Sequence, residues 1–298
     1  MPIHFSFSFV TGHRHGGFIS NGRLSSIGEG KPMSDKQELV VSKEGPVCTL
    51  IINNTEKRNA LTRECHSLIG QTFEELSHDK KIRVVIIRGA GEEAFSAGAD
   101  IKAMPIRGGS AEVRRRNLED YIEASYEAVM KYPYPVIAML YGYTLGAGCV
   151  LAMACDIRIA STNVKMGIPT SRMGLIATHQ GFKRLFDVLG YSTALEIFLT
   201  GRTYDGQDCR TMGLVNHLVD HDQLETYTYK MADEITRCAP LSLRGSKYIL
   251  GRIADNPLLS VEDIEKFQLL SRQAAASDDH EEAKKAFKEK RKPVFYGA

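Results

Sequence analysis

The segment from Gly142 to Gly148, GYTLGAG, has the residue types of a turn that presents a helix N-terminus. It follows the apolar run Val136–Leu140, which is typical of a buried strand, and no charged residue lies between Gly148 and Asp156. The first N–H groups of a helix have no partner inside the helix and carry partial positive charge. In a dry interior they are donors for an anion or for a developing oxyanion. The segment alone favours a structural turn, because it lacks the third glycine of a dinucleotide-binding motif and the Gly-Lys-Ser/Thr of a phosphate loop.

A second segment, EAFSAGADIK (residues 93–102), follows the apolar strand pattern of residues 84–87 and also ends in a turn of small residues. Together, FSAGADIK and GYTLGAGCVLAMACDIRIA resemble the enoyl-CoA hydratase/isomerase (crotonase) superfamily. The similarity extends from about residue 39 to residue 297, which is nearly the whole chain. Three further motifs stand in the family's order: NNTEKRNALT (53–62), LTGRTYDGQDCRTMGLVNHLV (199–219) and FKEKRKPVF (287–295).

The resemblance implies an α/β fold of the crotonase type, a ββα superhelix followed by a C-terminal α-helical region. It also implies an acyl-CoA enzyme in which two backbone N–H groups bind the thioester oxygen and stabilise the enolate. These N–H groups correspond to Ala97 and Ala147 here. Coenzyme A is then part of the substrate, and neither a prosthetic group nor a metal is expected. The residues that the resemblance places against substrate or CoA are Arg58, Ala60, Ala97, Gly98, Ala99, Asp100, Ile101, Gly146, Val150, Thr170, Thr178 and Lys290.

The chain departs from the family pattern at the two glutamates that act as acid and base in its hydratases. The corresponding positions are Val150 and Thr170. Neither side chain transfers a proton near neutral pH, and a positioned acid or base typically contributes about 10²–10⁴ in rate. Hydration by the usual mechanism is therefore in doubt.

Other side chains near these motifs are candidates for the missing chemistry. His179 is a candidate acid or base because imidazole is a common proton-transfer group in enzymes, although a helix-start histidine that faces solvent or packs against Phe182 is the preferred interpretation. Arg172 suits a substrate carboxylate, and a structural ion pair with Asp156 or Asp187 is an equally good explanation. Asp100 is explained as the N-cap of a following helix.

Three functions remain open. The first is an acyl-CoA enzyme of the hydratase/isomerase type that stabilises a thioester enolate. The second is a decarboxylase of the methylmalonyl-CoA type, because loss of CO₂ forms the enolate without a base and a carboxylate in the pocket would repel the substrate. The third is an accessory protein that binds acyl-CoA without catalysis. RNA binding is disfavoured, since residues 62–80 contain four acidic side chains and no basic stripe.

The composition supports these classes. With 298 residues, 43% hydrophobic and 25% charged, the chain is an ordinary soluble globular protein. A net charge of +2 gives no electrostatic argument for nucleic acid or an anionic membrane, and no apolar run has the roughly 20 residues of a membrane span. The six cysteines have no C-x-x-C spacing, which predicts reduced core residues and not disulfides or metal ligands.

Periodicity predicts the elements that position the motifs. Residues 38–41 and 47–52 predict a hairpin, and Asn59 or Thr62 caps the helix that follows. The strands at 83–88, 136–140, 157–161 and 214–219 predict a largely parallel sheet with βαβ crossovers. We expect three regions: a leader at residues 1–35, a crotonase-like core at 36–235 and a C-terminal helical trimerisation or lid region at 236–298.

The leader has no acidic residue before Glu29, and Met33 is a plausible alternative start. A disordered or misassigned leader is favoured over a transit peptide. The expected compartment is the cytoplasm, with the mitochondrial matrix as the alternative if residues 1–35 are a transit peptide. The resemblance implies a homotrimer or hexamer, with no nucleic-acid or membrane partner.

Overall fold

The computed structural model describes residues 37–100, 121–255 and 258–297. Contacts divide the chain into two units, Met1–Asp35 and Lys36–Ala298. The predicted leader, residues 1–35, lies outside the described residues. Within the described residues, none of the helices combines the length and the apolar character that crossing a membrane requires.

A six-stranded sheet forms the centre of the larger unit. Its order is β1-β2-β3-β5-β7-β10. Only β1 and β2 pair antiparallel, and every later neighbour is parallel. The predicted hairpin and the largely parallel sheet are confirmed. The strands are β1 (Leu39–Glu44), β2 (Val47–Ile52), β3 (Val84–Gly89), β5 (Val136–Leu140), β7 (Ile157–Ser161) and β10 (His217–Val219).

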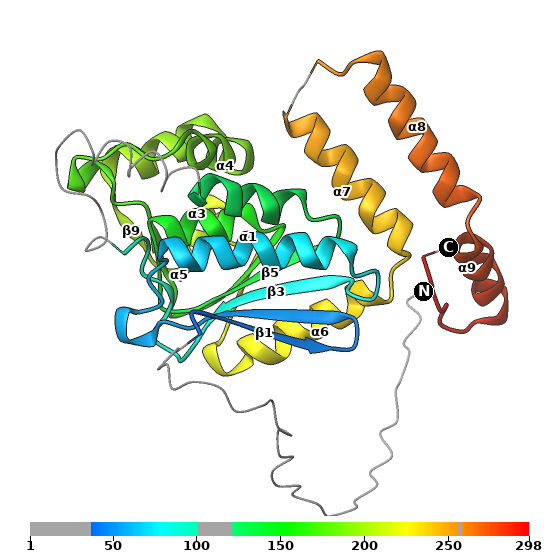
Figure 1. The fold of residues 1–298 in the computed structure, drawn as a ribbon, viewed down its shortest axis with the longest axis horizontal. Coiled ribbons are helices and arrows are strands. Elements are labelled where there is room, and N and C mark those ends of the chain that lie inside the picture. The colour runs from blue at the N-terminus through cyan, green and yellow to red at the C-terminus, as the bar shows by residue number, and fades with distance from the viewer. Residues whose placement is uncertain (1–36, 101–120, 256–257, 298) are drawn as a thin grey trace, which may run out of the picture. The chain divides into compact units, whose positions relative to one another are not determined.

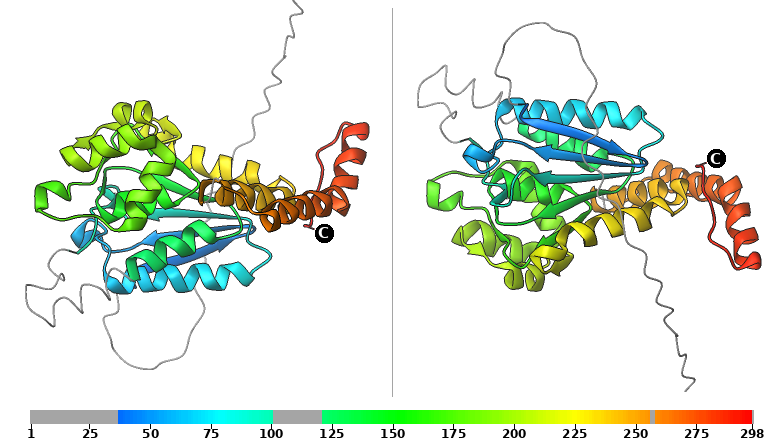
Figure 2. Two further views of the ribbon diagram at one scale, coloured as in Figure 1. Left: turned by 90° about the horizontal axis from the view of Figure 1, so that it is seen from above. Right: turned by 90° about the horizontal axis from the view of Figure 1, so that it is seen from below.

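Alternation along the central strands explains why both faces of this sheet are covered. Side chains on a strand point to opposite faces in turn. In β3, Val85 and Ile87 join one apolar cluster, and Val84 and Ile86 join another. The first cluster lies under α1 (Arg63–His78), the helical residues 121–131 and α3 (Ala147–Ala154), and the second under α6 (Leu224–Thr236). Figures 1 and 2 show α1 and α6 on opposite faces of the strands.

A second sheet, which periodicity did not predict, carries the two turns of interest. Its order is β4-β6-β8-β9, and β4 pairs parallel with β6. The strands have only two or three residues each, which is too short for an alternating pattern to be recognised. They are β4 (Ala94–Ser96), β6 (Tyr143–Leu145), β8 (Lys165–Gly167) and β9 (Thr203–Tyr204).

Specific side chains fix the start of α1 and the end of α3. The Thr62 hydroxyl accepts the N–H of Cys65, so Thr62 and not Asn59 is the N-cap of α1. At the C-terminal end of α3, Arg158 donates to Cys155 O at 2.9 Å and Arg184 donates to Met153 O at 2.6 Å. Two guanidinium groups thus bind carbonyls at the C-terminal end of α3, where positive charge stabilises the helix dipole. The N-terminus of α3 faces the second sheet.

The remaining elements complete the core and the helical end of the chain. Lys247 on α7 pairs with Asp156 at 2.6 Å and donates to Tyr134 O at 3.0 Å, which fastens α7 to the core. The elements are η1 (Thr55–Lys57), η3 (Ser171–Met173), α4 (His179–Thr200), α5 (Gly206–Met212), η4 (His221–Gln223), α7 (Pro240–Asp255), α8 (Val261–Ala275) and α9 (Asp278–Glu289).

Candidate functional site

The turns that follow β4 and β6 touch each other. Gly98 has φ +103°, and a Cβ there would lie 2.8 Å from Leu145 O and 3.5 Å from Ala147 N. Gly148 packs against β4 just as closely, since its Cβ would lie 2.7 Å from the Ser96 Cβ. Any side chain at these two positions would separate the turns, which is why both are glycine. The two segments singled out in the sequence therefore meet at one place.

Hydrogen bonds decide which N–H groups at this place are free. Ala97 N donates to Arg58 O at 2.9 Å, so the N–H that the sequence analysis assigned to the thioester oxygen is already occupied. Leu61 donates to Gly98 O and accepts from Asp100 N. Because bonds to Leu61 use the groups on either side of Ala99, the N–H of Ala99 points away from Leu61. Within the described part of the chain, the N–H groups of Ala99 and Ala147 have no hydrogen-bond partner.

The loop that holds Arg58 in place is centred on a buried asparagine. Asn59 is 1% exposed, and its side-chain N–H₂ donates to Ala90 O at 2.9 Å and Ala94 O at 2.7 Å. Arg58 and Asn59 have φ values of 51° and 56°, a region that asparagine tolerates better than most residues. The Arg58 side chain pairs with Glu93 at 2.5 Å and lies over the Tyr143 ring, 5.1 Å from its centroid.

Of the two positions that lack the family's glutamates, Val150 lies beside the start of α4, whereas the neighbours of Thr170 contact Gly201 at the end of that helix. Val150 is 6% exposed, and a Cβ on Gly181 would lie 3.5 Å from Val150 Cγ2. Thr178 caps α4 by accepting the N–H of Gly181 at 3.2 Å. His179, the first residue of α4, is exposed, as the preferred interpretation expected. Thr170 is half-buried, and its carbonyl accepts the N–H groups of Met173 and Leu175.

Other candidates have structural partners. Arg172 donates to Thr200 O at 3.1 Å, while Asp156 pairs with Lys247 and Asp187 with Lys183, so the ion pairs predicted for Arg172 are wrong. Asp100 pairs with Lys57 at 2.7 Å. The helix that Asp100 was expected to cap, and Ile101 itself, lie outside the described residues.

The remaining members of the predicted set lie in three regions. Ala60 is buried beside Asn59. Gly146 is the N-cap of α3, and its N–H donates to Gly167 O at 2.8 Å. Lys290 is exposed and ends α9 with φ 53°. The structure thus gathers the residues around Gly98 and Gly146, and it places Lys290 in the C-terminal helices.

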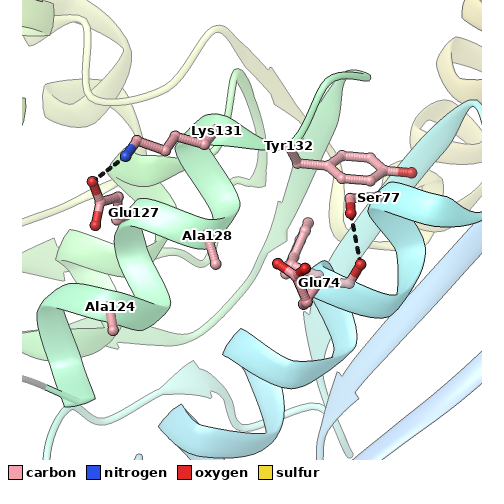
Figure 3. A pocket seen from close by; sticks show the side chains of 8 residues that line it. Glu74, Ser77, Ala124, Glu127, Ala128, Lys131 and Tyr132 are labelled. Atoms are coloured by element: carbon pink, nitrogen blue, oxygen red, sulfur yellow. Dashed lines mark hydrogen bonds and ion pairs between the residues drawn. The ribbon is translucent and has the colours of Figure 1, made fainter.

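A groove of about 260 Å³ lies elsewhere, between α1 and the helical residues 121–131 (Figure 3). Lys131 and Glu127 form an ion pair at 2.5 Å on one side of it, and Glu74 lies on α1. The lining residues are Phe73, Glu74, Ser77, Ala124, Glu127, Ala128, Lys131 and Tyr132. None of the predicted site residues belongs to this set, so the groove is separate from the two turns.

Histidines, cysteines and carboxylates are scattered in the described part of the chain, and most of the thiols are buried. There, no three His, Cys, Asp or Glu side chains lie together in a way that would hold a metal ion. All six cysteines are free, and five of them are buried. Burial raises the pKa of Cys149 and Cys209 to about 12, which keeps both thiols protonated.

One buried polar side chain was not singled out in the sequence. His66 on α1 is 1% exposed, and its Nδ1 lies 2.7 Å from the Ser125 hydroxyl. That hydroxyl donates to Ile122 O, so His66 Nδ1 carries the proton that it shares with Ser125. His66 Nε2 is buried without a partner in the described part of the chain. Burial lowers the pKa of His66 from 6.5 to about 4.

We expect this histidine to make the protein less stable in acid. Between about pH 4 and 6.5 the unfolded chain binds the proton and the folded chain does not, so the free energy of unfolding falls as the pH drops. The full loss is roughly 3 kcal/mol. The free energy of unfolding of both proteins is measured by urea denaturation at pH 7 and at pH 4. The decrease between these two pH values should be about 3 kcal/mol smaller for His66→Leu than for the wild type. His78→Leu, an exposed change on the same helix, is the control, and identical slopes in all three proteins would contradict the prediction.

Comparisons with known proteins match the same region. A protein-family model described as enoyl-CoA hydratase/isomerase matches residues 42–298. The 2,3-dehydroadipyl-CoA hydratase of Escherichia coli (strain K12) is 31% identical over 262 residues, covering 87% of this chain and 99% of that protein. The mitochondrial methylglutaconyl-CoA hydratase of Homo sapiens is 31% identical over 255 residues, or 84% of this chain and 74% of that protein.

Solved structures agree with these relatives. An enoyl-CoA hydratase/carnithine racemase from Magnetospirillum magneticum has a TM-score of 0.82 at 29% identity, covering 89% of this chain and 97% of that one. An enoyl-CoA hydratase from Bacillus anthracis has a TM-score of 0.79 at 30% identity, covering 88% and 100%.

Proposed function

Since the chain belongs to the enoyl-CoA hydratase/isomerase family and has the crotonase fold, we propose that it binds an acyl-CoA thioester and stabilises the thioester enolate with the N–H groups of Ala99 and Ala147. The supporting observation is that these two N–H groups are unpaired and belong to turns in direct contact. Donors aimed at a developing oxyanion in a dry site are typically worth about 10²–10³ in rate each. Ala99 takes the role first assigned to Ala97, whose N–H is bound to Arg58 O.

We place the CoA moiety along the loop that precedes α1. The Arg58 side chain is more than half exposed in this loop. Ala60 lies next to Leu61, whose backbone pairs with Ala99, so this part of the loop is close to the Gly98 turn. A guanidinium group suits the phosphates of CoA. Lys290 is proposed as a further phosphate contact, supplied from the C-terminal helices. Enzymes of this family use CoA thioesters without a prosthetic group, and we propose the same here.

The reaction on the enolate is the open part of the proposal. The relatives are named as hydratases, but hydration requires a proton donor and a base at the substrate. Val150 and Thr170 supply neither, and His179, the exposed first residue of α4, remains the candidate acid or base. We therefore propose a lyase of the enoyl-CoA hydratase/isomerase type in which the two N–H groups stabilise the enolate, with His179 as the candidate for the proton transfer that hydration or isomerisation needs.

Decarboxylation is the second candidate, favoured by the apolar surroundings of Val150. When CO₂ leaves a malonyl-type thioester, the electron pair of the broken C–C bond forms the enolate, so no base is needed. A buried valine at this position does not repel the departing carboxylate. The first turn of α4, which lies beside Val150, favours negative charge.

Incubation with crotonyl-CoA and, separately, with methylmalonyl-CoA distinguishes these candidates. Hydration adds the mass of water to the first ester, and decarboxylation removes the mass of CO₂ from the second. Turnover of either supports catalysis at the two turns. Tight binding of both esters with no turnover would favour an accessory protein, and failure to bind any CoA ester would contradict the proposal as a whole.

We also propose a homo-oligomer, a trimer or a hexamer. Several large apolar side chains on α4 are exposed in the single chain, including Phe186 at 51%, Tyr191 at 68% and Leu199 at 69%. A face of this kind is typical of a protein interface. Light scattering of the purified chain tests this, and a monomeric mass would contradict it. The choice between cytoplasm and mitochondrial matrix depends on residues 1–35, which lie outside the described residues.

A further inference from the structure

The carbonyl of Ala147 accepts a hydrogen bond from a buried tyrosine. The Tyr126 hydroxyl donates to Ala147 O at 3.0 Å. Tyr126 is 2% exposed, and burial raises the pKa of its phenol well above the ordinary value, so it stays protonated and remains a donor. The bond joins the helical residues 121–131 to the first residue of α3.

This bond lies next to a part of the backbone that is intrinsically free to rotate. Gly146 has φ 50° and ψ −120°, a conformation that residues with a side chain rarely adopt. Rotation of the Gly146–Ala147 peptide would turn the Ala147 N–H away from the Gly98 turn. Gly146 N is held by Gly167 O at 2.8 Å on one side of this peptide, and Ala147 O is held by Tyr126 on the other.

Tyr126 is itself held in place by its neighbours. The His66 ring lies against it edge to face, with ring centroids 5.7 Å apart and planes at 80°. The adjacent Ser125 binds His66 Nδ1 at 2.7 Å and Ile122 O at 2.8 Å. A chain of contacts therefore runs from α1 through residues 125 and 126 to the start of α3.

We propose that Tyr126 is a positioning residue that keeps the Ala147 N–H aimed at the substrate carbonyl. This inference rests on the proposed function, in which that N–H binds the thioester oxygen. Tyr126 does not touch the substrate in this role. Its hydroxyl restrains the first peptides of α3, so the donor needs no reorganisation when negative charge develops on the oxygen.

The test uses the full chain with butyryl-CoA carrying ¹³C at the thioester carbonyl. Hydrogen bonds to a carbonyl oxygen weaken the C=O bond, so its infrared stretch moves to lower frequency on binding. In Tyr126→Phe, which removes only the hydroxyl, we expect a smaller shift than in the wild type, with a dissociation constant changed by less than about tenfold. Tyr229→Phe is the matched control. Tyr229 lies on α6, and its hydroxyl is hydrogen-bonded to Thr49 on β2 at 2.9 Å.

Ser125→Ala serves as a second variant, because it loosens the helix that carries Tyr126 and keeps the tyrosine hydroxyl. We expect it to reduce the shift in the same direction. A carbonyl frequency equal to that of the wild type in every variant that folds would overturn the role of Tyr126. A bound ester with no shift in the wild type itself would instead show that the proposed function is wrong.

Discussion

Gly98→Ala should abolish most of the binding preference for an acyl-CoA over free CoA, together with any turnover. The alanine Cβ would lie 2.8 Å from Leu145 O, and φ +103° is a conformation that alanine rarely adopts. The turn must move or separate from α3, at a cost of about 1–3 kcal/mol in backbone strain. Movement of either turn misaligns the N–H groups of Ala99 and Ala147, and losing one such donor costs about 10²–10³ in rate.

Gly70→Ala on α1 is the matched control. Gly70 has no positive φ, and its Cβ would have no atom within 4 Å. Alanine is the better helix former by about 0.5–1 kcal/mol, so this variant should be slightly more stable and otherwise unchanged. The affinities for butyryl-CoA and for CoA are measured by calorimetry in both variants. Unchanged affinity and turnover in Gly98→Ala would contradict a site between the two turns.

The double variant Val150→Glu with Thr170→Glu should gain hydratase activity. The two glutamates would supply the acid and base that the chain lacks, and a positioned pair of this kind typically contributes about 10²–10⁴ in rate. Val150 lies beside the first turn of α4, where a carboxylate is favoured by the helix dipole. The conversion of crotonyl-CoA, followed by product mass, should therefore rise well above the wild-type rate.

Val150→Gln with Thr170→Gln is the control for this gain. Glutamine has nearly the size and polarity of glutamate but does not transfer protons, so the pair should leave hydration at the wild-type level. If the glutamate pair performs no better than the glutamine pair, residues 150 and 170 do not flank the substrate as the family alignment implies.

The sequence was sufficient for the parts of the fold that depend on local patterns. The hairpin β1–β2 follows from its turn residues, and the parallel strands of the central sheet follow from apolar runs in strand–helix–strand order. Capping residues limited the start of α1 to Asn59 or Thr62, and the structure shows that Thr62 is the cap. The second sheet was missed for the same reason. Strands as short as Ala94–Ser96 and Tyr143–Leu145 are defined by pairing across about 50 residues, and they carry no periodicity of their own.

The choice of oxyanion donor shows a similar limit. Ala97 and Ala99 flank Gly98 and look equivalent in the sequence. Only the pairing across the turn, in which Arg58 O takes the Ala97 N–H and Leu61 binds the groups on either side of Ala99, distinguishes them. Knowledge that Leu61 pairs with this segment would have identified Ala99, because N–H groups alternate in direction along an extended chain.

Polar side chains inside helices were equally hard to find. Helical spacing places His66 in the core, and Tyr126 is indistinguishable in the sequence from an aromatic residue that only packs. Their importance depends on the Ser125 and Ala147 atoms that they meet, 59 and 21 residues away in the chain. No local pattern encodes those contacts.

A crystal structure of the chain with butyryl-CoA bound is the most direct test of the two-donor site. We predict a thioester oxygen about 3 Å from both Ala99 N and Ala147 N, with the Ala97 N–H still bound to Arg58 O. An ester whose carbonyl oxygen lies away from both nitrogens, with side chains filling the space between the turns, would contradict the proposed site.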